Sequence, residues 1–207
     1  MKCDVVLRRE ELLKIAPPLV AISSLGEHAG CGCFASSDAI EGDIMALYPG
    51  VVVPKALVST VLHFLPLHNG YLISRGDGYL IDADTSNDAS RALLRSAMNR
   101  RMGRTIPQQQ QQQQPQQLQH ELGGGIAVGH LVNHSVLCAN VRAVDVVYEK
   151  DCDELIPVAM FGAPTTDRMP GVALVATRHI AKGEELFLNY AFTSDPAGWP
   201  QWYSNSQ

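Results

Sequence analysis

The chain has 207 residues, of which 46% are hydrophobic and 18% charged, and its formal net charge is −5. This length favours one domain, or one domain with a small extension, and suffices for a core without disulfides or metals. The slightly acidic balance argues against nucleic acid as a partner, since such proteins normally present a basic face. Five cysteines without a signal-peptide pattern predict an intracellular protein, with nucleus and cytoplasm left open. No apolar run reaches the roughly 20 residues of a membrane span.

The first elements in chain order alternate between helix and strand. Residues 8–16 predict a short helix that ends at a pair of prolines. The stretch from Gly30 to Val53 predicts a strand, a glycine turn and a second strand. For residues 57–65 the periodicity leaves a short helix and a buried strand open. The Asp77-Gly78 dipeptide then lies between two apolar runs and predicts a hairpin.

The middle of the chain predicts an insertion over about 85–125. Residues 88–104 predict a helix with one apolar face, and its arginines favour a solvated basic face over an anion site. The Gln-rich stretch 107–119 is of low complexity and is expected to be disordered, because it has little to bury. Beyond the insertion the chain predicts further short strands separated by glycine turns. The whole pattern indicates a mostly β (α+β) fold.

Three short motifs are candidates for chemistry. Gly30-Cys31-Gly32 would let a ligand approach the main chain, since glycine has no Cβ. Asn133-His134-Ser135 offers amide and imidazole donors and acceptors. The third motif, from Gly183 to Tyr190, joins an acidic pair to a lone tyrosine. Taken singly, these motifs also fit a common turn, a self-satisfied turn and a buried tyrosine.

In this order the three motifs resemble the signature of the SET-domain lysine methyltransferases, and most of all the SET domain-containing protein nine group. The resemblance implies a SET fold of small β-sheets with a pseudoknot-like C-terminal segment and an inserted, partly disordered arm. It covers residues 25–192. Residues 1–24 would be an N-terminal extension, and residues 193–207 an aromatic C-terminal tail.

The resemblance also implies roles for single residues. Tyr190 would be the catalytic residue. The residues expected to bind the cofactor S-adenosylmethionine are Gly30, Cys31, Gly32, Asn133, His134 and Tyr190. Those expected to line the channel for the substrate lysine are Tyr48, Leu188 and Phe192. Asn140 matches the family's final asparagine if one extra residue is allowed.

The chain departs from the family pattern at two places. Leu188 stands where related enzymes carry an aromatic residue that limits how many methyl groups are added. No cysteine follows Cys152, so the zinc-binding module of many relatives is missing. No metal is expected, because Cys31, Cys33 and His134 have no recognised ligand spacing.

The resemblance therefore implies a monomeric enzyme that transfers a methyl group to a lysine of a protein or peptide substrate. The altered Asn-His-Ser segment and the missing zinc module keep a second hypothesis open. In that hypothesis the chain is a catalytically inactive SET-fold module that binds peptides.

Overall fold

The computed structural model describes residues 5–26, 29–62, 71–84, 125–149, 152, 155, 158–160 and 168–190. The predicted helix at 88–104, the Gln-rich stretch and the aromatic tail lie outside the described residues, and so does Phe192. Within the described ranges, no helix has the length and apolar character needed to cross a bilayer.

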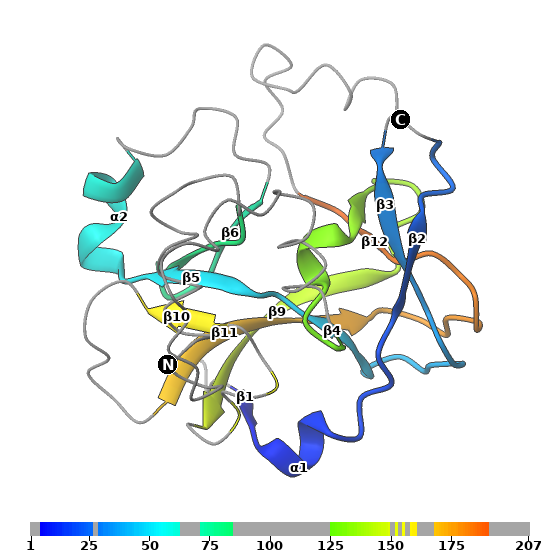
Figure 1. Ribbon diagram of the computed structural model, residues 1–207, viewed down its shortest axis with the longest axis horizontal. Helices are drawn as coiled ribbons and strands as arrows, with labels where there is room; N and C mark the ends of the chain where they lie inside the picture. The colour runs from blue at the N-terminus through cyan, green and yellow to red at the C-terminus, as the bar shows by residue number, and fades with distance from the viewer. Residues whose placement is uncertain are drawn as a thin grey trace, which may run out of the picture.

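Strands dominate the described part of the chain and form three sheets (Figure 1). The largest has the order β4 (Ile44–Leu47), β11 (Arg168–Ala176), β9 (Val141–Glu149), β12 (Phe187–Leu188) and β8 (Asn133–His134), with β1 (Val5–Leu7) also on β9. The second has the order β10 (Val158–Met160), β5 (Gly50–Val53), β7 (Leu80–Asp82) and β6 (Leu72–Ser74). The third pairs β2 (Leu19–Ile22) with β3 (Cys31–Phe34). The mostly β prediction is confirmed.

The described helices are short. They are α1 (Arg9–Leu12), α2 (Lys55–Leu62) and the 3-10 turn η3 (Gly129–Leu131). The sequence left a short helix and a buried strand open for residues 57–65. The N-terminal part of that segment is helical, since it belongs to α2.

The core lies around the long antiparallel pair β9 and β11. Residues 171–176 of β11 are all buried, because the sheet is covered on both faces there. Gly171 is required at its position, since a Cβ would overlap the ring of the fully buried Tyr148. Removing that much apolar surface from water is the main stabilising term of the fold.

The C-terminal segment threads between two strands that follow one another in the chain. β8 and β9 are consecutive, yet β12 lies between them and runs parallel to both. Asn140, in the link between β8 and β9, holds this segment: its Oδ1 accepts from the Phe187 amide at 2.8 Å, and its Nδ2 donates to the Glu185 carbonyl at 2.8 Å. This is the pseudoknot-like arrangement that the resemblance implied.

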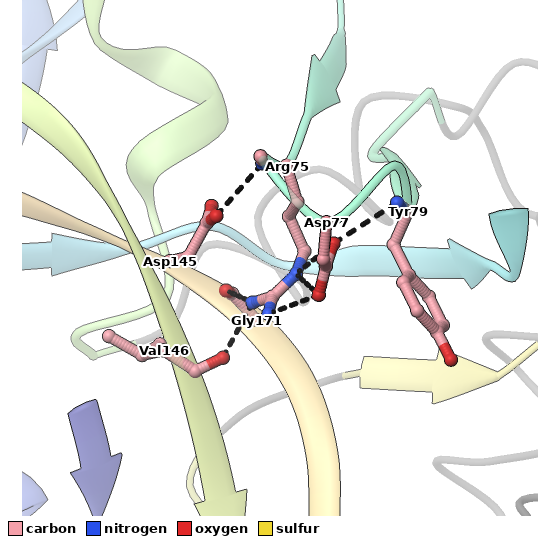
Figure 2. A network of polar contacts seen from close by, with 7 residues as sticks. Arg75, Asp77, Tyr79, Asp145, Val146 and Gly171 are labelled. Carbon is pink, nitrogen blue, oxygen red and sulfur yellow. Dashed lines mark hydrogen bonds and ion pairs between the residues drawn. The ribbon is translucent and has the colours of Figure 1, made fainter. Parts of the chain in front are cut away.

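A buried arginine ties the β6–β7 hairpin to the large sheet (Figure 2). Arg75 follows β6, and its Nη1 donates to the carbonyl oxygens of Val146, at 2.6 Å, and of Gly171. Its Nε and Nη2 donate to the Asp77 carboxylate. Burial alone would raise the pKa of Asp77, but the hydrogen bonds from Arg75 outweigh it, and the net shift is downward. Asp77-Gly78 forms the turn, with Gly78 at φ +90°, so the hairpin prediction is confirmed.

Candidate functional site

The first and third motifs meet directly. The Leu186 amide donates to the Cys33 carbonyl at 2.7 Å, so the segment after Gly183 runs beside β3. A Cβ on Gly32 would overlap the Glu185 carboxylate and lie 3.2 Å from Nδ2 of Asn133. Glycine at position 32 thus allows all three motifs to touch.

The buried carboxylate of Glu185 is the hub of this junction. It accepts hydrogen bonds from Ser23 Oγ at 2.7 Å, from the Ser24 amide at 2.7 Å, from Ser24 Oγ, and from Asn133 Nδ2 at 3.3 Å. Asn133 Nδ2 also donates to the Cys31 carbonyl at 3.2 Å. A buried carboxylate needs such compensation, and here it fixes the loop that precedes Gly30.

Gly30 and Cys31 are both exposed beside this junction. Gly30 adopts φ +67°, and a Cβ there would have no atom within 4 Å. Cys31 is exposed, whereas Cys33 is fully buried, and burial raises the pKa of its thiol to about 12. Within the described ranges, no three His, Cys, Asp or Glu side chains form a group that could hold a metal ion.

His134 and Tyr190 form the second half of the site. The Tyr190 amide donates to Nδ1 of His134 at 3.0 Å, and the two rings lie 5.1 Å apart at 50°. Burial lowers the pKa of His134, while a hydrogen bond with the Leu188 backbone raises it, and the net shift is downward. His134 is therefore neutral at pH 7, and its side chain orients Tyr190.

The Tyr190 phenol is held in turn by the main chain, because its hydroxyl donates to the Val132 carbonyl at 2.6 Å. Burial raises the pKa of Tyr190, with Tyr71 and Cys33 adding to the shift. Burial likewise raises the pKa of Tyr48, with Tyr190 the next contribution. Both phenols are therefore neutral at pH 7, and they lie close enough to influence each other.

The sequence prediction missed several residues that build this site. Ser23 and Ser24 carry no motif, and only the tertiary contact with Glu185 reveals them. Glu185 itself was part of the third motif, but its role as hydrogen-bond hub was not predicted.

Two further residues named from the sequence also lie here. Leu188 is buried and lies opposite His134 in the parallel β8–β12 pair. Asn140 contacts the C-terminal segment.

The fold and this junction define a mostly β domain with a threaded C-terminal segment, and comparison with known proteins identifies its family. The SET domain family matches residues 30–191. Since this match covers most of the chain, the chain belongs to the SET-domain family. The SET domain is typical of protein-lysine methyltransferases.

Two curated relatives share the name SET domain-containing protein 9. The Homo sapiens protein is 29% identical over 172 aligned residues, and the match covers 78% of this chain and 54% of the relative. The Pongo abelii protein is also 29% identical, over 78% of this chain and 59% of the relative. The chain thus spans a little over half the length of these relatives, and their relationship to it is distant.

Two solved structures match most of the chain, with low TM-scores and low identity. One is a Plasmodium falciparum protein named as a candidate histone methyltransferase, with a TM-score of 0.39, 15% identity, and coverage of 86% of this chain and 96% of that one. The other is a humanized mutant of the Chaetomium thermophilum Polycomb Repressive Complex 2 bound to the inhibitor GSK126. Its TM-score is 0.42 at 16% identity, over 85% of this chain and 15% of that one.

Proposed function

We propose that this chain is an S-adenosylmethionine-dependent methyltransferase that acts on a lysine amine of a protein or peptide. The observation that carries the proposal is the fixed position of Tyr190, whose hydroxyl donates to the Val132 carbonyl and whose amide donates to His134, close to the buried Tyr48. The family assignment supports the same chemistry at the coarser level.

The residues beside Tyr190 fit the proposed cofactor. Gly30 and Cys31 are exposed, and a Cβ on Gly30 would meet no atom within 4 Å. Asn133, in β8, donates to the Cys31 carbonyl and so joins β3 to β8. Gly30, Cys31, Gly32, Asn133 and His134 would hold S-adenosylmethionine. The cofactor would supply a sulfonium methyl group as the group transferred. The Asn133 and His134 side chains already bond within the protein, and their strand β8 lies at the edge of its sheet.

The protein must deliver the target amine in its neutral form. A free lysine has a pKa of about 10.4, and only the uncharged amine has a lone pair for attack. Tyr48 and Tyr190 are neutral phenols, so they do not stabilise the ammonium as a carboxylate would. The tyrosines would exclude water and align the amine, which is where much of the rate arises. The amine would release its proton to water before the transfer, so that its lone pair is free to accept the methyl group.

The primary experiment measures cofactor binding. Titration calorimetry should detect binding of S-adenosylmethionine and of S-adenosylhomocysteine. Either compound, at a hundredfold excess over its Kd, should stabilise the folded chain by about 2.7 kcal/mol and so raise the melting temperature. Transfer of a labelled methyl group to a library of lysine-containing peptides then tests the reaction. No thermal shift at millimolar cofactor would refute the proposal.

The same experiment separates the enzyme from a catalytically inactive peptide-binding module. Peptide binding without any cofactor binding would favour the module. Cofactor binding together with methyl transfer would exclude it.

A further inference from the structure

His130 has a buried side chain in the short helical turn η3. It lies in η3, three residues before Asn133, and only 6% of its surface is exposed. In the part of the chain that the structure describes, neither Nδ1 nor Nε2 of His130 has a hydrogen-bond partner. Burying unpaired polar atoms costs free energy, so native proteins retain them where another requirement outweighs that cost.

Three tyrosines surround the turn that carries His130. Gly129, the residue before it, packs on the main chain of β4, where a Cβ would lie 2.9 Å from the Leu47 carbonyl and 3.2 Å from Cα of Tyr48. Val132, two residues after it, receives the Tyr190 hydroxyl. The Tyr71 ring meets the His130 ring edge-on, with centroids 6.3 Å apart at 60°.

Tyr48, Tyr71 and Tyr190 influence one another electrostatically, and the Tyr71 ring contacts His130. Tyr71 is near enough to add to the burial-driven rise in the pKa of both Tyr48 and Tyr190. Burial lowers the pKa of His130 to about 4. At pH 7 its ring is therefore neutral, with one N–H donor and one nitrogen able to accept.

We infer that His130 is a substrate-binding residue whose unprotonated ring nitrogen accepts a hydrogen bond from an N–H of the target lysine amine. The inference rests on the proposed function and names a binding partner for the amine beyond the tyrosines. Such a bond would restrict rotation of the amine and leave its lone pair free for the methyl group. A neutral acceptor favours the ammonium form less than a carboxylate would, so it preserves the effect of desolvation.

The direct test observes the His130 imidazole by NMR in the whole chain. Its signal is assigned among the seven histidines as the one that disappears in His130→Phe. Nα-acetyl-lysine amide is then titrated, with and without S-adenosylhomocysteine, and Nα-acetyl-norleucine amide, which lacks the amine, is the matched control. The lysine compound should shift the His130 signal at least several-fold more than the control. Equal shifts, or none, would overturn the inference.

A stability measurement tests the same idea without a substrate. His130→Phe and His130→Leu both remove the unpaired nitrogens, and at least one of them should raise the melting temperature by roughly 2–6 °C. His134→Phe is the control and should lower it, because the Tyr190 amide loses its acceptor. A lower melting temperature in both His130 variants would show that the nitrogens have structural partners, and would overturn the inference.

The outcomes separate this inference from the proposed function. Failure to bind S-adenosylhomocysteine would refute the methyltransferase, and the amine titration without cofactor would still decide whether His130 binds an amine. Cofactor binding with no amine-specific shift would refute the role of His130 alone.

Discussion

The amide nitrogen of Tyr190 donates a hydrogen bond of 3.0 Å to Nδ1 of His134, so the imidazole fixes the main chain that carries the phenol. The pairing of Phe187 and Leu188 with Asn133 and His134 brings these strands together. His134, which the sequence predicted to bind the cofactor, therefore also positions Tyr190 within the protein.

Tyr190→Phe should abolish most methyl transfer while the affinity for S-adenosylmethionine stays nearly unchanged. The phenol is expected to orient the amine at the transition state, so its loss should appear in turnover. Losing the hydroxyl bond to Val132 should cost only about 0.5–1.5 kcal/mol of stability. Turnover and calorimetry on one validated peptide provide the measurement. Full activity in the variant would show that Tyr190 is not the catalytic residue.

Asn133→Ala should weaken cofactor binding by roughly 5- to 150-fold, which corresponds to about 1–3 kcal/mol. Its Nδ2 joins the Cys31 carbonyl to the Glu185 carboxylate, so its loss frees β3 from β8. Calorimetric titration measures the change. Ser36→Ala, in the loop after β3, is a useful control because Ser36 lies outside this junction. An unchanged Kd in Asn133→Ala would contradict the assignment.

Gly32→Ala should destabilise the chain by about 1–3 kcal/mol and reduce cofactor affinity, because the added methyl displaces the Glu185 carboxylate. Gly183→Ala separates this effect from backbone strain: Gly183 adopts φ +83° but a Cβ there meets nothing within 4 Å. Urea unfolding should find both variants less stable. Only Gly32→Ala should lose affinity, and equal losses of affinity would argue against the steric explanation.

Stability should fall as the pH drops from 7 to 5. The unfolded chain protonates His130 near its ordinary pKa of 6.5, whereas the folded chain resists protonation down to about 4. Between these values the unfolded state binds more protons, so acid favours unfolding, by about 2 kcal/mol from His130 alone. Urea unfolding at both pH values measures this loss. His130→Leu should remove most of the difference, and an unchanged pH dependence in that variant would contradict it.

Arg75→Met should cost roughly 2–4 kcal/mol, because two buried carbonyls, those of Val146 and Gly171, lose their donor. Arg178→Met is the matched control: its ion pair with Glu184 is largely exposed and should contribute about 0–1 kcal/mol. Chemical denaturation compares the two. Similar losses in both variants would show that the Arg75 network (Figure 2) does not anchor the hairpin.

Local patterns were sufficient for much of the architecture. The Asp77-Gly78 turn, the short helix α1 and the apolar runs of β9 and β11 follow from residue preferences that act over a few positions. The order of the three motifs likewise indicated the family that the comparison confirmed. These features depend on neighbours in the chain, so the sequence by itself determined them.

Only the tertiary structure decided how the site is supported. Ser23 and Ser24 reach Glu185 across about 160 residues, and the unpaired nitrogens of His130 can be recognised only once its surroundings are known. Likewise, only the tertiary structure shows that the two-residue strand β12 lies between β8 and β9. Hydrogen-bond partners and burial depend on which distant segments come into contact, and residue preferences that act over a few positions do not determine those contacts.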